Sequence, residues 1–125
     1  MGLGVILYAH GARDARWAEP FEAVAARVRA AAPGAVVALA FLELMAPSLG
    51  DAAADLVRAG ATRIDVVPLF LGTGGHLRRD LPPLVAALRA AHPGVDFRLH
   101  AAIGEHAAVV EAMAAAAVAA AGFGE

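Results

Sequence analysis

The sequence contains no cysteine. Disulfide bonds, thiolate metal sites and cysteine nucleophiles are therefore excluded. Lysine is also absent, so all 10 basic residues are arginines. A P-loop needs a lysine after its glycines, so this class of nucleotide site is excluded as well. No apolar run approaches the ~20 residues that a membrane-spanning helix requires.

Serine is almost missing too, and the one serine, Ser48, stands in a Pro-Ser-Leu-Gly segment rather than in a nucleophile elbow. The His-Glu-x-x-His run of a zincin helix does not occur. After the first predicted strand Gly11 is the only glycine, so the Rossmann fingerprint is incomplete. These absences argue against serine hydrolases, zincins and dinucleotide-binding enzymes.

The length of 125 residues indicates a single domain over residues 1–125. The formal net charge of -2 argues against nucleic acid as the main partner. Residues 1–8 lack the basic region of a signal peptide. We therefore expect a cytoplasmic protein that does not attach to membranes.

Apolar strand patterns and helical patterns alternate four times along the chain. The predicted strands are Leu3–Ala9, Ala35–Leu42, Arg63–Leu71 and Val95–Ala101. The predicted helices are Arg16–Ala32, a second opened by Ser48, a third opened by Asp80, and Gly104–Ala121. This alternation predicts an α/β fold, a four-stranded parallel sheet with helices on both faces. The flavodoxin-like strand order 2-1-3-4 is the one we expect.

Helix boundaries and buried faces follow from the same patterns. Ser48 is the expected N-cap of the second helix, and Asp80 that of the third, with Pro82 and Pro83 in its first turn. The third helix should face the sheet with four apolar residues: Leu81, Leu84, Val85 and Leu88. The last, alanine-rich helix has its own apolar side: Val109, Val110, Met113 and Val118.

The stretch from Arg63 to Asp80 carries the most informative residues. A buried strand broken by Pro68 leads into Gly72-Thr73-Gly74-Gly75, where regular structure should end. His76, Arg78 and Arg79 follow directly. Because ligands of open α/β sheets bind beyond the carboxyl ends of the strands, we expect chemistry in this loop.

Two histidines should meet at that edge. His10 ends the first strand and His76 follows the third, and the predicted order makes these strands neighbours. Two imidazoles without a thiolate suit a divalent metal such as Co²⁺, Fe²⁺, Ni²⁺ or Zn²⁺. Glu43, after the second strand, could add a carboxylate. Each residue alone could equally be structural, which is the interpretation we give to the other three histidines, His92, His100 and His106.

Four arginines flank the same strand ends: Arg13, Arg16, Arg78 and Arg79. Charges near helix starts are ordinarily a solvated surface. Four guanidinium groups around one crevice would also suit a polyanionic ligand. Asp14 and Asp80 could pair with them or act only as caps.

Taken together, these segments resemble the small, single-domain sirohydrochlorin chelatases of the class II chelatase superfamily. The matching segments occur in the family's order over most of the chain: His10-Gly11-x-Arg13-Asp14, Phe41-Leu42-Glu43, Pro47-Ser48-Leu49, Gly60-Ala61, Val67-Pro68-Leu69-Phe70-Leu71, Gly75-His76 and Asp80-Leu81-Pro82. Two features depart from the family pattern. Ala12 stands where the family usually has serine, and residues 72–75 are unusually rich in glycine.

The resemblance implies ATP-independent insertion of Co²⁺ or Fe²⁺ into sirohydrochlorin, in cobalamin or sirohaem biosynthesis. Ni²⁺ and Zn²⁺ are further options, the metal is a substrate, and no permanently bound cofactor is expected. His10 and His76 would bind metal and accept protons, with Glu43 as a further ligand or proton relay. The four arginines would bind the carboxylates of the substrate. Longer members have two such domains, so this short chain is expected to be a homodimer.

Two alternatives remain open at this point. One is a phosphohistidine-type phosphatase, although its arginine before the histidine is replaced by Ala9. The other is a non-catalytic module that binds metal or tetrapyrrole through the same histidine pair.

Overall fold

The computed structural model describes residues 2–72 and 74–123, and its centre is a parallel sheet of four strands. The strands are β1 (Leu3–Ala9), β2 (Ala35–Phe41), β3 (Arg63–Pro68) and β4 (Asp96–Leu99). Their order in the sheet is β2-β1-β3-β4. The fold class and strand order predicted from the sequence are confirmed, and all four strands end at one edge, the carboxyl edge.

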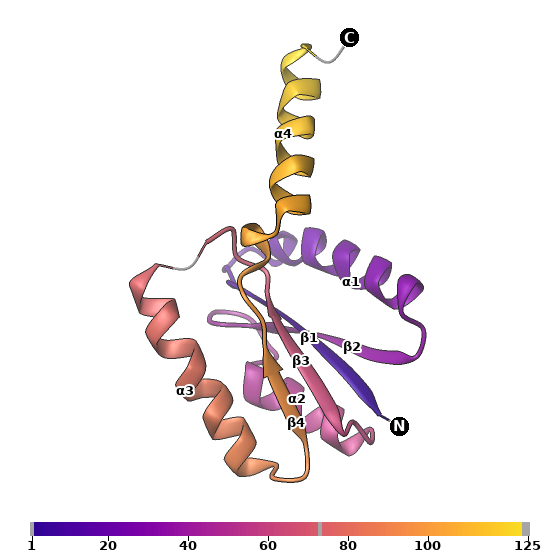
Figure 1. Cartoon of the computed structure of the whole chain (residues 1–125), viewed down its shortest axis with the longest axis vertical. Helices are drawn as coiled ribbons and strands as arrows, with labels where there is room; N and C mark the ends of the chain where they lie inside the picture. Colours follow the sequence, from indigo (N-terminus) through magenta and orange to yellow (C-terminus); the bar gives the residue numbers. More distant parts are fainter. Residues whose placement is uncertain (1, 73, 124–125) are drawn as a thin grey trace.

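Four α-helices connect and follow the strands. They are α1 (Glu19–Ala31), α2 (Leu49–Arg58), α3 (Gly75–Ala91) and α4 (Ala107–Ala121), with 3₁₀ turns at Ala15–Ala18 and Ile103–Glu105. α1 lies on one face of the sheet, and α2 and α3 lie on the other (Figure 1). Ser48 caps α2 as predicted, because its hydroxyl accepts a hydrogen bond from the Asp51 amide at 3.2 Å.

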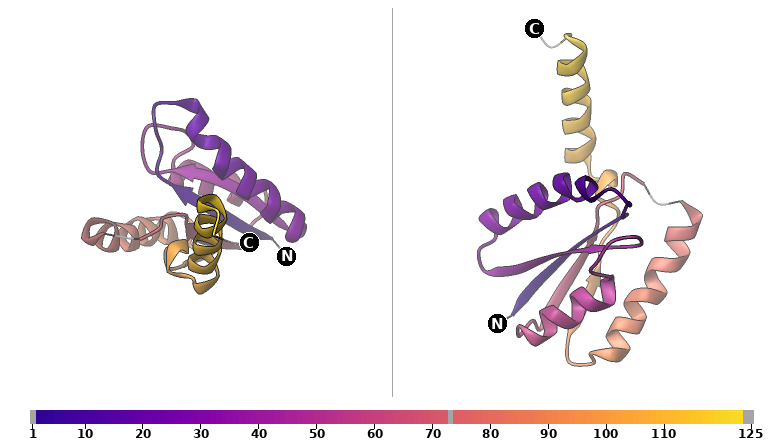
Figure 2. Two further views of the ribbon diagram at one scale, coloured as in Figure 1. Left: turned by 90° about the horizontal axis from the view of Figure 1, so that it is seen from above. Right: turned by 180° about the vertical axis from the view of Figure 1, so that it is seen from behind.

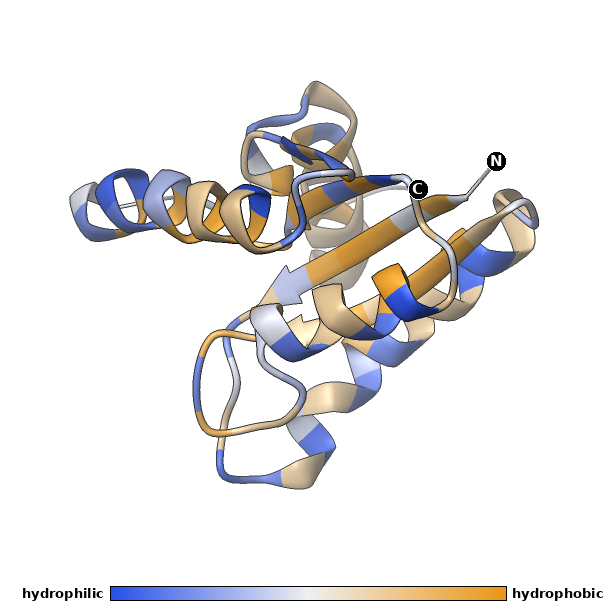
Figure 3. Cartoon of the chain, turned by 90° about the horizontal axis from the view of Figure 1, so that it is seen from below, coloured by the Kyte–Doolittle hydropathy of each residue, from blue (hydrophilic) through white to orange (hydrophobic). Residues whose placement is uncertain are grey.

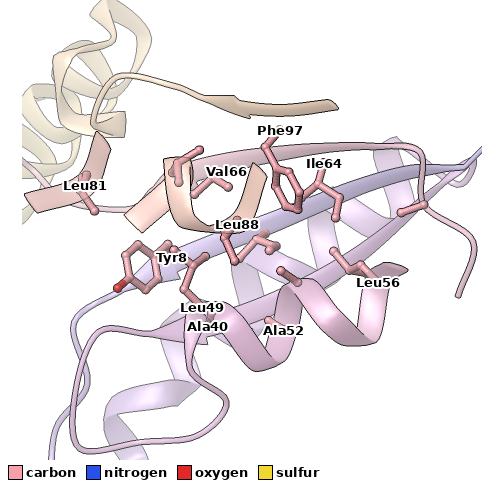
Figure 4. Close-up of a cluster of buried hydrophobic side chains, with 14 of the residues drawn as sticks. Tyr8, Ala40, Leu49, Ala52, Leu56, Ile64, Val66, Leu81, Leu88 and Phe97 are labelled. Carbon is pink, nitrogen blue, oxygen red and sulfur yellow. The ribbon is translucent and has the colours of Figure 1, made fainter. Parts of the chain in front are cut away.

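The main core lies between the sheet and the pair α2 and α3. Alternate residues of the strands point into it, including Ile6, Ile64, Val66 and Phe97, and meet Leu56 and other residues of the two helices (Figure 4). In Figure 3 the strands are mostly orange, whereas the helices alternate between apolar and polar positions. Each large side chain buried here contributes about 1.5–3 kcal/mol to stability.

β3 is shorter than the predicted Arg63–Leu71 because Pro68 cannot donate to the sheet. Pro68 lies opposite Tyr8 in the register, and one more hydrogen bond follows, from the Leu69 amide to the Tyr8 carbonyl at 2.7 Å. The chain then turns away from the sheet. Phe70 and Leu71 are thereby placed at the carboxyl edge beside the end of β1.

α3 begins earlier than the sequence predicts. Gly74 is its N-cap, so His76, Arg78 and Arg79 lie in its first turns, and Asp80 is helical rather than a cap. The Arg78 amide donates to the Gly74 carbonyl at 3.1 Å, and the Arg79 side chain donates to the Gly75 carbonyl at 3.1 Å. These bonds form a helical turn ahead of the two prolines, which therefore lie inside α3. Thr73, in the predicted glycine loop, lies outside the described residues.

The expected inward position of Leu84 is wrong. Leu81, Val85 and Leu88 are buried with exposed fractions of 5%, 0% and 8%, whereas Leu84 is 41% exposed. The three buried residues have the spacing i, i+4, i+7, which fills one face of the helix. Leu84 lies at the margin of that face and points to solvent.

The last helix does not cover the sheet. α4 projects from the carboxyl edge, away from the rest of the molecule (Figure 1 and the right view of Figure 2). It has no buried residue, so the expected packing of Val109, Val110, Met113 and Val118 within the same chain does not occur. No helix among the described residues is both long and apolar enough to cross a membrane.

Candidate metal and substrate site

The site is built where β1 and β2 end side by side. The Leu42 amide donates to the Ala9 carbonyl at 2.8 Å, which holds the loop after β2 against the end of β1. Gly11 lies so close to this loop that a Cβ atom there would be 1.8 Å from the Glu43 carbonyl oxygen. Glycine is required at position 11 because any side chain would push the Glu43 loop away.

This close approach pairs His10 with Glu43. Nδ1 of His10 lies 3.2 Å from Oε1 of Glu43, and the two side chains are 48% and 42% exposed. The imidazole also packs on the ring of Phe70, with 4.7 Å between ring centroids. Trp17 donates from its indole nitrogen to the His10 carbonyl at 2.6 Å. His10 is therefore fixed through both its backbone and its ring while one side of the ring stays open to solvent.

An apolar pocket of about 420 Å³ opens beside His10. Its lining comes from the ends of β1 and β3 and from the start of α1: His10, Trp17, Phe21, Leu69, Phe70, Leu71 and Gly72. Trp17 and Leu71 remain 43% and 67% exposed, so the pocket has an apolar rim. A larger pocket of about 610 Å³ between α1 and β2 is lined by none of the predicted site residues.

The surroundings of Glu43 are unusual in two respects. Burial raises the pKa of Tyr8, at the end of β1, and the negative charge of Glu43 raises it further. Leu44, the next residue after Glu43, has a left-handed backbone with φ of 67° and is 62% exposed. A leucine in this conformation costs on the order of 1 kcal/mol, and such strained positions cluster at functional sites.

The three predicted metal ligands do not form one cluster. Within residues 2–72 and 74–123, no group of three or more histidine, aspartate or glutamate side chains is placed to hold a metal ion. His10 and Glu43 come together, while His76 lies exposed in the first turn of α3. The early start of α3 moves His76 from a loop onto a helix, so its position is set by that helix rather than by the strand end.

The predicted arginines divide into two pairs around the carboxyl edge. Arg13 and Arg16 follow β1, and Arg16 forms an ion pair with Asp14 at 2.8 Å. The Arg16 side chain and backbone amide both donate hydrogen bonds to the Asp14 carboxylate, and these bonds lower the pKa of Asp14. Arg78 and Arg79 lie in the first turns of α3 and are exposed. All four are on the side of the molecule that carries His10.

The other three histidines lie outside the pocket beside His10. His92 ends α3 and its ring lies 6.1 Å from that of Phe97. His100 lies 2.7 Å from Asp65 through Nε2. His106 precedes the first residue of α4. None of them lines the pocket beside His10.

Sequence reasoning missed the aromatic walls of the site. Trp17 and Phe70 both contact His10, yet they lie in segments that looked like ordinary helix and strand. One signal was available, since Trp17 is the only tryptophan and lies seven residues after His10. Such spacing across a tight turn places an aromatic ring beside the strand end.

Comparison with known proteins shows the family of the chain. The sequence model of the CbiX family matches residues 4–120, nearly the whole chain. The chain belongs to the CbiX family. The structure of a CbiX protein from Marinobacter aquaeolei VT8 superimposes with a TM-score of 0.83 at 37% identity, covering 95% of this chain and 97% of that one.

Two further relatives are named as chelatases. A sirohydrochlorin cobaltochelatase of Saccharolobus solfataricus is 37% identical over 83 residues, which cover 66% of this chain and 63% of that protein. The sirohydrochlorin chelatase SirB of Bacillus subtilis subspecies spizizenii, solved in complex with cobalt, superimposes with a TM-score of 0.78 at 29% identity. The superposition covers 90% of this CbiX chain and 48% of the SirB chain. The match thus spans less than two thirds of the cobaltochelatase and about half of SirB.

Proposed function

We propose that this CbiX protein is a lyase-type metal chelatase that inserts Co²⁺ or Fe²⁺ into sirohydrochlorin without ATP, in cobalamin or sirohaem biosynthesis. The observation that carries the proposal is the His10–Glu43 pair, half exposed at the mouth of an apolar pocket. Relatives named as sirohydrochlorin cobaltochelatase and sirohydrochlorin chelatase support the substrate. The metal ion is a substrate here, and the reaction needs no permanently bound cofactor.

The His10–Glu43 contact supports a different role for each nitrogen of the imidazole. A carboxylate accepts hydrogen bonds, so in this proposal Nδ1 would carry the proton and donate to Glu43, and Nε2 would keep its lone pair. Carboxylate partners of this kind orient a metal-binding histidine and raise its basicity. His10 would therefore bind the incoming ion through Nε2. Glu43 holds the ring and accepts protons, rather than serving as an independent ligand.

A site with so few ligands suits the delivery of a metal. A closed tetrahedral site with four protein ligands would retain the ion, whereas one or two imidazoles leave positions for water and for the macrocycle. His76 and the arginines of α3 lie in the first turns of that helix, after the end of β3. When a divalent ion replaces two pyrrole protons of sirohydrochlorin, charge is conserved, and His10 and Glu43 are the nearest bases to receive those protons.

The surroundings also suit the shape of the substrate. Sirohydrochlorin is a broad, flat macrocycle with peripheral carboxylates. Its face would lie against the apolar rim formed by Trp17 and Leu71. Its carboxylates would reach the arginines after β1 and at the start of α3. One pocket covers one side of such a disc, which supports a homodimer in which a second chain covers the other side.

The direct test is anaerobic mixing of sirohydrochlorin with Co²⁺, Fe²⁺ or Ni²⁺, with and without protein, followed by absorbance. The proposal expects metallated product to form faster with protein, and multiple turnovers per chain. His10→Ala with His76→Ala should lose most of this acceleration while the far-ultraviolet circular dichroism stays unchanged. His92→Ala, a histidine outside the pocket, is the matched control and should keep the wild-type rate.

The two alternative functions give different results in the same experiment. A binding module would shift the absorbance of sirohydrochlorin without turnover. A phosphohistidine-type phosphatase would hydrolyse a phosphomonoester and lose this activity in His10→Ala. Either outcome, without accelerated metal insertion, would contradict the proposal.

A further inference from the structure

The loop that carries Glu43 is fixed at its neck. The Phe41 amide, at the end of β2, donates to the Pro47 carbonyl at 2.9 Å. One residue further along, the Leu42 amide donates to the Ala9 carbonyl at 2.8 Å. The first bond closes the loop on itself, and the second ties it to the end of β1. The chain therefore enters Glu43 from a fixed position.

The other side of Glu43 is anchored by Met45. The Met45 side chain packs against the buried cluster that includes Ala9 and Phe41. It also lies beside Gly11, because a Cβ atom at that glycine would be 3.2 Å from Cγ of Met45. Both sides of Glu43 are thus held near the end of β1. The chain has to reverse its direction within a few residues to satisfy both anchors.

The reversal is made by a tight turn centred on Leu44. The Met45 amide donates to the Glu43 carbonyl at 2.8 Å, a hydrogen bond from residue i+2 to residue i, and φ of Leu44 is 67°. This combination indicates a γ-turn with a left-handed central residue, which is rare and strained. Among the described residues, Leu44 is the one residue other than glycine with a positive φ. The turn leaves the Glu43 carbonyl against Gly11 and the Glu43 carboxylate 3.2 Å from Nδ1 of His10.

Leucine is an unfavourable residue for such a turn. Glycine adopts a positive φ freely, whereas the Cβ atom of a leucine is crowded by the backbone in this conformation. The Leu44 side chain is 62% exposed, so burial within the chain does not offset the strain. The hydrogen bonds and packing on the two sides of the turn offset it instead. Strain that the surrounding structure holds in this way is typical of residues that preorganise a functional site.

We propose that Leu44 is a positioning residue, whose left-handed γ-turn aims the Glu43 carboxylate at His10. This inference deepens the proposed function and rests on it, because His10 and Glu43 are the groups that receive metal and protons there. A negative φ at Leu44 would break the bond between the Met45 amide and the Glu43 carbonyl. The Glu43 carboxylate would then move away from the imidazole. The site requires the backbone conformation of residue 44 rather than its side chain.

Substitutions at position 44 separate these two properties. Leu44→Pro fixes φ at about −65° and cannot form the turn. Co²⁺ affinity and the initial rate of Co²⁺ insertion should both fall at least about tenfold, as expected when a metal-binding histidine loses its carboxylate partner. Leu44→Ile keeps an apolar side chain, but a β-branched residue resists a positive φ, so both quantities should fall about two- to fivefold. Isothermal titration measures the affinity, and absorbance measures the rate.

Leu44→Gly is the conformational rescue. It removes the whole side chain but accepts the turn, so it should recover Co²⁺ affinity and insertion rate to within about twofold of the wild type. The larger chemical change is therefore expected to have the smaller effect. Leu84→Ile is the matched control for the isoleucine variant. Leu84 is an exposed leucine inside α3, and its replacement should leave both quantities at the wild-type value.

A second measurement reports the contact between Glu43 and His10 directly. In ¹⁵N-labelled protein without metal, the chemical shifts of the ring nitrogens show which nitrogen of neutral His10 carries the proton. Wild type and Leu44→Gly should hold the proton mainly on Nδ1, facing Glu43. Leu44→Pro should show the same tautomer mixture as Glu43→Ala. Should the proline variant fail to fold, as judged by circular dichroism, the comparison of Leu44→Ile with Leu44→Gly decides the question.

The results that overturn this inference differ from those that overturn the proposed function. Loss of Co²⁺ affinity in Leu44→Gly as large as in Leu44→Ile or Leu44→Pro would assign the role to the leucine side chain. Wild-type affinity and tautomer in Leu44→Ile and Leu44→Pro would show that the turn positions nothing. If the chelatase proposal is wrong, no variant accelerates metal insertion, yet Co²⁺ affinity still decreases in the order glycine, isoleucine, proline.

Discussion

At the residue scale, the position of Glu43 depends on Gly11. The Glu43 carbonyl occupies the space that a side chain at position 11 would fill. Gly11→Ala should therefore displace the Glu43 loop from His10 and reduce metal insertion at least about tenfold, at a cost of roughly 1–3 kcal/mol in unfolding free energy. Initial rates and a urea titration measure the two effects.

Gly34→Ala is the control for this substitution, because nothing lies within 4 Å of a Cβ atom at Gly34. Its insertion rate should equal that of the wild type. A Gly11→Ala protein as active as Gly34→Ala would show that the close approach of the two loops has no part in the reaction.

A second feature at this scale is the polar cluster around Asp65 on β3. Asp65 lies 2.7 Å from His100 and 3.0 Å from Arg63. Burial raises the pKa of the Asp65 carboxyl, but the hydrogen bonds and charges of His100 and Arg63 outweigh burial, and the net pKa is lowered. A carboxyl whose pKa is lower in the folded state stabilises the fold above its unfolded pKa.

The pH dependence of the unfolding free energy follows from the lowered pKa of Asp65. The contribution of Asp65 should be complete at neutral pH and should disappear as the pH falls below about 4, towards the lowered pKa of the folded state. Asp65→Asn should lower the unfolding free energy at pH 7 by about 1–3 kcal/mol and flatten its decrease in acid. Denaturant titrations between pH 7 and pH 2 measure this, and an identical acid slope in both proteins would rule out the assignment.

At the element scale, α3 gives a matched pair of substitutions. Leu81 is 5% exposed and faces the sheet, whereas Leu84 is 41% exposed one turn along. Leu81→Ala should lower the unfolding free energy by about 2–5 kcal/mol, because it leaves a cavity in the main core. Leu84→Ala should change it by less than about 0.5 kcal/mol. Equal effects of the two substitutions would contradict the orientation of α3.

The elements also show how far the sequence determines the fold. β1, β2 and the N-cap Ser48 follow from local signals: β-branched runs, turn residues and a capping hydroxyl. The start of α3 could not be predicted, because Pro82 and Pro83 resemble a first turn and the bonds that begin the helix at Gly75 involve the Arg79 side chain. Leu84 was predicted to face the sheet because residues 81–88 contain four apolar side chains, and helical spacing alone does not decide which of them lie on the buried face.

The candidate site was predictable only in part, for a similar reason. His10 and Glu43 follow strand ends, so topology alone brings them to one edge. The contact between them depends on the approach of Gly11 to a distant loop, and the walls of Trp17 and Phe70 depend on tertiary packing. The orientation of α4 was not predictable either, because its pattern shows that it needs burial but not where it is buried.

At the scale of the whole molecule, the proposed homodimer makes stability depend on protein concentration. A partner that binds only the folded chain stabilises it by mass action. The thermal midpoint of the wild type should therefore rise with protein concentration. Calorimetric scans over a hundredfold range of concentration measure this. A wild-type midpoint independent of concentration would argue against the homodimer.

At the scale of the whole molecule, the His10–Glu43 pair lies at the edge of the sheet where an apolar pocket opens. The central claim is that His10 and Glu43 act together to deliver a divalent metal to sirohydrochlorin. The most direct measurement is the initial rate of anaerobic Co²⁺ insertion in four proteins: wild type, His10→Ala, Glu43→Gln and the double variant. Because the two residues form one unit, each single change should lower the rate at least about tenfold, and the double variant should be no slower than the slower single variant. Wild-type rates in His10→Ala, or single losses that multiply in the double variant, would contradict the account.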